Sequence, residues 1–205
     1  MDLEQVKLNP VQESIIQSAL SLFAKKGYGQ TSVRDIVHKA GTTMPMIYYY
    51  FESKEGLYAY ILKDAARHLL QSLDPKDKQG ASARERLKMG ICSFLEFCQI
   101  NKDEIQLIFS AWFGGELPPE GPSIITVYES MVKQVQTLLQ SGIDNQEFKK
   151  HDVQEVAQAI IGVMTNYVAR ILVGGEALDP WHHSEQTMEL FIKGLAYPGR
   201  YSKRR

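Results

Sequence analysis

One stretch of 21 residues, 31–51, constrains the fold of this chain more than any other: TSVRDIVHKAGTTMPMIYYYF. Ser32 and Asp35 have the spacing of a capping box, which predicts that a helix begins there. Gly41 predicts the end of that helix, because glycine adopts the left-handed backbone conformation at little steric cost. Either threonine after the glycine can cap a second helix, with Pro45 tolerated in its first turn. The stretch therefore predicts two short helices joined by a tight turn.

Two short helices across a glycine turn are typical of the helix-turn-helix, which places its second helix in the major groove of DNA. The chain has 205 residues and a net charge of −1, which argues against non-specific coating of nucleic acid. The segment 25–54 nevertheless has a net charge of +3, and a local positive patch favours a site-specific DNA-binding protein. The cations of this segment are Lys25, Lys26, Arg34, Lys39 and Lys54, and its anions are Asp35 and Glu52.

The rest of the chain has the apolar spacing of helices, without the sustained two-residue alternation of strands. We expect an all-α protein of about nine helices. Capping residues and breaks in the apolar pattern set the helix starts. The expected starts are Asn9, Ser32, Thr42 or Thr43, Ser53, Ser82, Asn101, Ser123, Asp152 and Ser184.

Several function classes are disfavoured. Cys92 and Cys98 are six residues apart, about 240° of rotation on a helix, so we expect neither a disulfide nor a shared metal. The sequence has no His pair spaced i, i+4, no nucleophile elbow, no P-loop and no dinucleotide fingerprint. We therefore predict no metal, no cofactor and no enzymatic activity. Without about 18 successive apolar residues or a signal sequence, we expect a cytoplasmic protein with no membrane partner.

A series of residues then matches one pattern in register: Ala19, Phe23, Gly27-Tyr28, Thr31-Ser32, Ile36, Ala40-Gly41, Ile47-Tyr48, Tyr50-Phe51, Ser53-Lys54-Glu55 and Leu57. The segment 16–57 thereby resembles the N-terminal domain of the TetR family of bacterial transcriptional regulators. The remaining residues match the family only in helix count and length. The resemblance implies a three-helix DNA-binding domain over 1–56, connected through a helix that extends to about residue 73. It also implies a larger helical domain over 57–205 that binds a small-molecule effector and forms a homodimer on a palindromic DNA operator.

On a helical wheel of the second motif helix, Ile47, Phe51, Met44 and Tyr48 form the core face. The opposite face carries Thr43, Pro45, Met46, Tyr49 and Tyr50, and the resemblance implies that it enters the major groove. That face lacks Arg, Asn and Gln, so we expect hydroxyl contacts to bases and apolar contacts to thymine methyl groups. The resemblance places Tyr48, Tyr50 and Lys54 on phosphates, together with the start of the first motif helix. The predicted DNA-binding residues are Thr31, Ser32, Thr42, Thr43, Met44, Pro45, Met46, Tyr48, Tyr49, Tyr50 and Lys54.

The second domain has two expected tasks. An apolar or aromatic effector would contact Phe94, Phe97, Phe109, Trp112, Phe113, Tyr128, Met131 and Met164. By the resemblance, the last two helices form the dimer interface, with Val156, Ile160, Tyr167, Phe191 and Leu195 as candidates. Ordinary core packing explains any single one of these side chains equally well. We thus predict a ligand-responsive regulator, most readily a repressor. The alternatives are a helical protein-interaction or small-molecule-binding protein without operator binding, and an enzyme of a new type.

Overall fold

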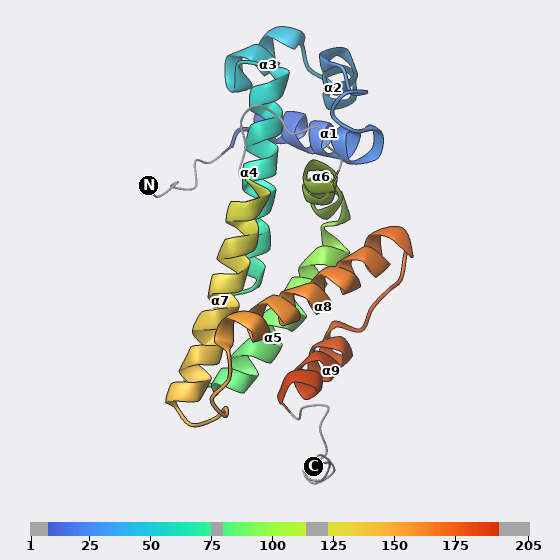
Figure 1. Ribbon diagram of the computed structural model, residues 1–205. Coiled ribbons are helices and arrows are strands. Elements are labelled where there is room, and N and C mark those ends of the chain that lie inside the picture. Colours follow the sequence, from blue (N-terminus) through green and yellow to red (C-terminus); the bar gives the residue numbers. More distant parts are fainter. Residues whose placement is uncertain (1–7, 75–79, 114–122, 193–205) are drawn as a thin grey trace. The chain divides into compact units, whose positions relative to one another are not determined.

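The computed structural model describes residues 8–74, 80–113 and 123–192, and these residues form nine helices and no strand. The prediction of an all-α fold is therefore confirmed. The helices are α1 (Pro10–Lys26), α2 (Val33–Ala40), α3 (Met44–Phe51), α4 (Lys54–Ser72), α5 (Ala83–Ile100), α6 (Lys102–Phe113), α7 (Ile124–Asp144), α8 (Val153–Val173) and α9 (Pro180–Ile192) (Figure 1).

Polar capping residues begin the helices largely where the sequence places them. The Asn9 side chain accepts hydrogen bonds from two backbone N–H groups in the first turn of α1. Ser32 and Asp35 form a reciprocal capping box at α2, and Asp152 accepts two backbone N–H groups at α8. These bonds satisfy amide groups that have no partner within their own helix. Local sequence therefore determines these helix starts.

The predicted start of α9 is wrong by four residues, because the helix begins at Pro180 rather than at Ser184. Asp179 is the cap: its Oδ1 atom accepts a hydrogen bond from the backbone N–H of His182 at 3.0 Å. Proline is favoured at the first helical position, since the N–H it lacks has no helical partner there. Ser184 is fully buried within the helix instead.

Helix α7 continues through Gly142 and ends at Asp144. Gly142 serves a close approach rather than a stop signal. A Cβ atom at this position would lie 2.2 Å from Cδ2 of Phe148, whose ring lies against the glycine. The backbone N–H of Phe148 donates to the Gly142 carbonyl at 3.0 Å. The residues after α7 are thereby folded back onto its last turn.

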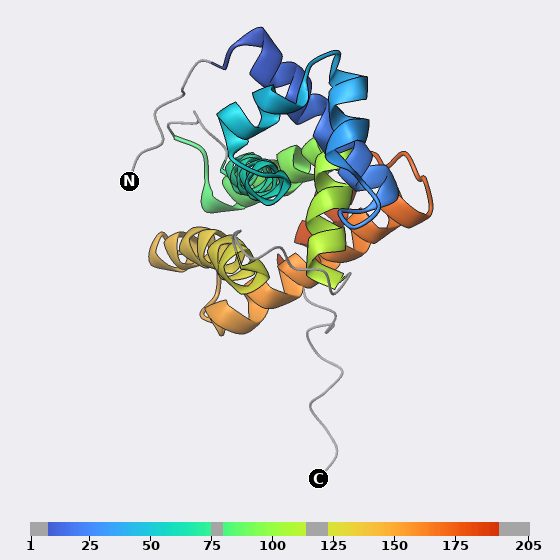
Figure 2. The same ribbon diagram turned by 90° about the horizontal axis from the view of Figure 1, so that it is seen from above.

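The chain divides into two compact units, and the first comprises residues 1–68 and 101–124. It contains α1, α2, α3, most of α4, and α6. Helix α1 packs against α2 and α6, and α2 packs against α3; Figure 2 views α4 end-on. Aromatic rings fix the end of α1, since Tyr58 makes T-shaped contacts with Phe23 at 5.1 Å and with Tyr28 at 4.8 Å. The buried core includes Ile15, Ala19, Phe23, Ile36, Ile47, Phe51, Leu57 and Ile108.

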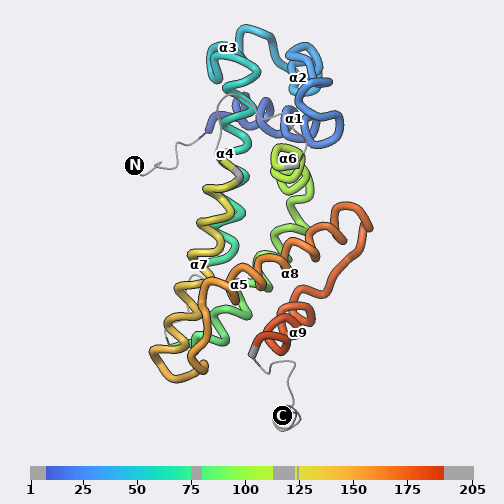
Figure 3. Tube along the Cα trace, in the orientation of Figure 1, coloured from blue at the N-terminus to red at the C-terminus, as the bar shows by residue number. Residues whose placement is uncertain are grey.

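The second unit comprises residues 69–100 and 125–205, with α5, α7, α8, α9 and the end of α4. Helix α5 packs against both α8 and α9, which also contact one another (Figure 3). The buried residues of the second unit include Leu87, Ile91, Leu95, Val135, Ile160, Met164, Val168 and Met188. These compact units do not test the boundary between DNA-binding and effector-binding domains at residue 56, which stays a prediction.

Helix α8 is the most apolar element of the second unit. Among the described residues it alone is long and apolar enough to cross a membrane, with a mean hydropathy of 1.5 over its most apolar window. A helix that packs in a protein core or interface meets the same criteria. Only 33% of that window is buried within the chain.

Candidate nucleic-acid interface

The turn between α2 and α3 has the predicted geometry. Gly41 lies in the left-handed region with φ of 65° and ψ of 34°, and the next backbone N–H, of Thr42, donates to the Val37 carbonyl at 3.1 Å. The Ser14 hydroxyl donates to the Ala40 carbonyl at 3.0 Å, which joins α1 to the last turn of α2. Thr43 is the N-cap residue of α3, although its side chain makes no capping hydrogen bond. The turn thus fixes the direction in which α3 leaves α2.

Helix α3 buries one narrow face and exposes the rest. Ile47 and Phe51 are buried, as predicted, and Met44 is half-buried. Tyr48 is 52% exposed, so its assignment to the core face is wrong. On the wheel it lies at the edge of the apolar arc, and Ile47 and Phe51 are the buried residues of this eight-residue helix. Its predicted contact with phosphate remains a prediction, as do all the DNA contacts.

The remaining α3 residues differ in how far they reach solvent. Tyr49 is 78% exposed, and Thr43 and Pro45 are exposed as well. Met46 is half-buried. Tyr50 is also half-buried, and its hydroxyl accepts a hydrogen bond from Nδ2 of Asn9 at 3.0 Å. The two outward tyrosines are therefore Tyr48 and Tyr49, rather than Tyr49 and Tyr50 as the wheel predicts.

Lys54, at the start of α4, holds the loop between α1 and α2. Its Nζ atom donates to the carbonyls of Tyr28 at 2.9 Å and Thr31 at 2.8 Å, and it lies 4.0 Å from the centre of the Tyr28 ring. Because an ammonium group has three N–H donors, at most one remains for a phosphate in this arrangement. Thr31 is 1% exposed and its hydroxyl donates to the Gly27 carbonyl at 2.9 Å, so its side chain lies inside the unit.

Ser32 lies at the surface at the start of α2. Its hydroxyl accepts from the backbone N–H of Asp35 at 3.1 Å and donates to Oδ2 of the same residue at 2.8 Å. Hydrogen bonds from Ser32, the backbone N–H first, lower the pKa of the Asp35 carboxyl group. The helix start is therefore well ordered, and its backbone dipole favours an anion nearby.

A second contact across the same loop had no local signal in the sequence. The Tyr28 hydroxyl donates to Oε1 of Glu55 at 2.7 Å. Partial burial, and then this bond to a carboxylate, raise the pKa of Tyr28, while the bond lowers the pKa of Glu55. Both residues match the family pattern, but the pairing requires the fold, since 27 positions separate them. Asn9 likewise gains its role toward Tyr50 only through tertiary structure.

The described surface of this unit carries the positive charge that the sequence predicts. Lys25, Lys26, Arg34 and Lys39 are all exposed and lie on α1 and α2. With the outward side of α3, they provide polar, aromatic and cationic groups on one helix-turn-helix. Such a combination suits phosphate contacts that position the helix and side-chain contacts at base edges.

The model of "Bacterial regulatory proteins, tetR family" matches residues 15–61, which span α1 to α4 of the first unit. Residues 15–61 form the DNA-binding domain of the TetR family. The chain is accordingly a DNA-binding transcriptional regulator with a helix-turn-helix, and the similar curated proteins are regulators rather than enzymes.

Similarity to TetR-family regulators extends over most of the chain. The uncharacterized HTH-type transcriptional regulator YdgC of Bacillus subtilis is 23% identical over 197 residues, covering 92% of this chain and 94% of that protein. The fatty acid metabolism regulator protein of the same organism is 22% identical over 187 residues, with 91% and 96% covered. The crystal structure of FadR from Bacillus subtilis in complex with stearoyl-CoA has a TM-score of 0.70 and 21% identity, covering 90% and 99%. The fold of both units is thus that of a TetR-family regulator.

The residues predicted to bind the effector fall into both units of the chain. In the second unit, Phe94, Met131 and Met164 are buried, Phe97 is half-buried and Tyr128 is exposed. In the first unit, the rings of Phe109 and Trp112 lie 5.8 Å apart, and both side chains are half-buried. The side chain of Phe113 lies outside the described residues. The shared pocket stays a prediction.

The predicted dimer residues vary in exposure. Ile160 and Tyr167 are buried, and the Tyr167 ring makes a T-shaped contact with His183 at 4.8 Å. Val156 and Phe191 are half-buried, and Leu195 lies outside the described residues. The exposed residues on the outward side of α8 are mostly small or polar, and they include Ala159, Gly162, Thr165, Asn166 and Val173.

Proposed function

We propose that this TetR-family regulator is a ligand-responsive repressor that binds a palindromic operator as a homodimer. A small apolar or aromatic effector releases it from the DNA. In this proposal residues 1–56 bind DNA, and residues 57–205 bind the effector and form the dimer. The protein acts in the cytoplasm and has no membrane partner, so α8 is a dimer helix rather than a membrane span. The outward face of α3, with Tyr49 78% exposed, is the observation that carries the proposal.

The α3 face binds the major groove. A large aromatic side chain on a short surface helix gains nothing from solvent, and its hydroxyl and ring suit a base edge. Tyr49, Thr42 and Thr43 supply hydroxyl groups, and Met44, Pro45 and Met46 supply apolar contact to thymine methyl groups. Phosphates contact Tyr48 and the exposed start of α2 at Ser32. Thr31, Tyr50 and Lys54 support this surface from within, and Lys54 retains one donor for a phosphate.

Dimerisation uses α8 and α9. Support comes from the apolar composition of α8, of which only 33% of the most apolar window is buried within one chain. The small residues Ala159 and Gly162 on its exposed side allow a second helix to approach closely. Two helices from each chain then form a four-helix interface with two-fold symmetry. That symmetry is what a palindromic operator requires.

We infer an apolar effector because the core of the second unit consists of apolar and aromatic side chains, including Phe94, Met131 and Met164. The complex of Bacillus subtilis FadR with stearoyl-CoA, a similar structure, supports an apolar effector for this chain. Binding in the second unit would release DNA by favouring a dimer in which the two heads no longer match the operator half-sites.

The test is a gel-shift titration with DNA from the region upstream of the protein's own gene. We expect saturable binding to an inverted repeat, with affinity falling steeply between about 50 and 200 mM salt as phosphate counterions are released. A matched fragment with one half-site scrambled is the control. Binding that ignores the repeat, or that is insensitive to salt, would favour the alternative of a helical protein without operator binding.

A further inference from the structure

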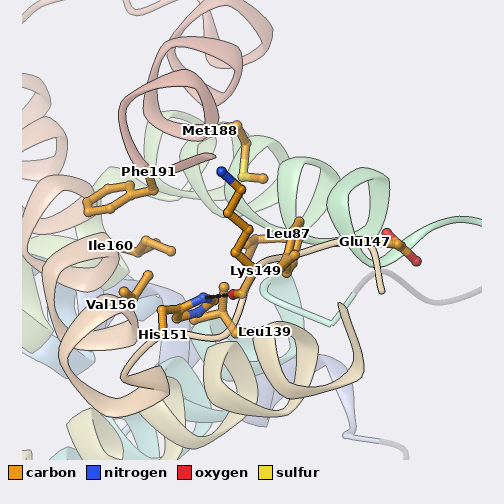
Figure 4. A pocket seen from close by; sticks show the side chains of 10 residues that line it. Leu87, Leu139, Glu147, Lys149, His151, Val156, Ile160, Met188 and Phe191 are labelled. Carbon is orange, nitrogen blue, oxygen red and sulfur yellow. Dashed lines mark hydrogen bonds between the residues drawn. The ribbon is translucent and has the colours of Figure 1, made fainter. Parts of the chain in front are cut away.

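A cavity of about 400 Å³ lies within the second unit, between the start of α5, the end of α7, α8 and α9 (Figure 4). This volume is in the lower part of the range for small-molecule sites, about 300–1,000 Å³. None of the residues predicted for the effector lines it, while three of the predicted dimer residues do. The apolar wall consists of Leu87, Leu139, Val156, Ile160, Met188 and Phe191.

The loop between α7 and α8 closes one side of this cavity, and its position is fixed. The Glu147 carboxylate accepts backbone N–H groups of Ala83 at 3.0 Å and Arg84 at 3.2 Å, at the start of α5. Phe148 is held on Gly142, as described above. The negative charge of Glu147 therefore lies at the positive end of α5, and the loop is held on both α5 and α7.

Two polar groups of the same loop also line the cavity. In Figure 4 the Lys149 side chain extends across the pocket toward the α9 side. Nδ1 of His151 lies 2.8 Å from the Lys149 carbonyl, which can only accept, so Nδ1 carries the hydrogen. The other nitrogen, Nε2, is then an acceptor, and it is buried with no hydrogen-bond partner among the described residues. A buried acceptor without a donor is unfavourable, and an O–H group of a ligand would satisfy it.

From this juxtaposition we infer that the cavity binds a medium-chain carboxylic acid. The alkyl chain lies against the apolar wall, and the acid transfers its proton to Nε2 of His151. The carboxylate that results accepts the Nε2–H group and pairs with the ammonium group of Lys149 after that flexible side chain turns back toward His151. The volume suits an alkyl chain of about eight to ten carbons. A single lysine at the cavity matches one acidic group rather than a polyanion.

The regulatory part of this inference rests on the proposed function. Val156 and Ile160 of α8, and Met188 and Phe191 of α9, contact the bound alkyl chain. Since α8 and α9 are the proposed dimer helices, an acid between them alters their spacing and hence the dimer. By thermodynamic linkage, operator DNA and the acid then weaken one another's binding by the same factor.

Isothermal titration calorimetry of the full chain with decanoic acid and with decan-1-ol tests the site. We expect one acid per chain, and binding of the alcohol at least tenfold weaker. Lys149→Met weakens acid binding about tenfold and leaves the alcohol unchanged, while the matched control Lys150→Met, at the exposed neighbour, changes neither. Val156→Phe fills the cavity and abolishes binding, whereas Val153→Phe, one turn earlier on α8, retains it. Absence of saturable acid binding, or equal effects of the two lysine variants, overturns the inference.

Operator binding by the same preparations separates this inference from the proposed function. If the acid does not bind while operator binding is intact, the cavity assignment fails and the regulator proposal stands. If the acid binds and operator affinity does not change, the cavity assignment stands and its effector role fails. Melting curves of each variant, recorded by circular dichroism, establish that the chain is folded.

Discussion

Replacing Lys54 with methionine is expected to destabilise the first unit, in addition to any loss of DNA affinity. Methionine keeps the apolar stem but removes two hydrogen bonds, to the carbonyls of Tyr28 and Thr31. A hydrogen bond from a charged donor contributes about 1.5–3 kcal/mol. Lys54 is half-buried, so hydrogen bonds to water replace part of the lost hydrogen-bond energy. A contact between the methionine sulfur and the Tyr28 ring also offsets part of the lost cation–π interaction. The expected net loss is about 2 kcal/mol in the free energy of unfolding.

For a chain of this length, a loss of about 2 kcal/mol lowers Tm by about 4–8 °C. Thermal unfolding followed by circular dichroism measures the shift, and Lys63→Met, at an exposed lysine of the same helix, is the control that should leave Tm unchanged. A Tm equal to that of the unmodified protein, together with weaker operator binding, would refute the reasoning. Lys54 would then act on phosphate alone.

Three further predictions concern the same unit. Gly41→Ala places a Cβ on a residue with φ of 65° and should cost about 1–2 kcal/mol of stability by urea unfolding, while Gly41→Asn should cost clearly less; equal losses would contradict the backbone argument. Tyr49→Ala should leave Tm within about 1 °C, because the side chain is 78% exposed, yet weaken operator binding about tenfold in fluorescence anisotropy. Tyr28→Phe removes the bond that lowers the pKa of Glu55, so the stability difference from the unmodified protein is present at neutral pH and shrinks as the pH falls below the ordinary pKa of a glutamate carboxyl group. A difference that grows toward acid pH would rule that bond out as its source.

Features set by neighbouring residues could be predicted from the sequence. The Asn9 cap, the Ser32–Asp35 capping box and the Gly41 turn each depend on backbone groups within four positions, and all three are present in the structure. The start of α9 was missed because two start signals compete, and the Asp179-Pro180 pair prevails over Ser184.

The details of the interface could not be predicted in the same way. A helical wheel gives the direction of a side chain but not its partner. Tyr50 is turned inward by Asn9, and Lys54 is held by carbonyls more than 20 positions away. Tyr48 is left outside because the first unit closes its core with Ile47 and Phe51. These outcomes depend on tertiary contacts that no local pattern contains.

The central claim, a dimer that places two α3 helices in successive major grooves, is tested most directly by DNase I footprinting of the upstream inverted repeat. The account predicts two protected half-sites related by two-fold symmetry and separated by one or more helical turns of about 10–10.5 base pairs. Both half-sites should become protected at the same protein concentration, with two chains bound at saturation. Protection of a single unsymmetrical site by one chain, or uniform protection along the fragment, would contradict it.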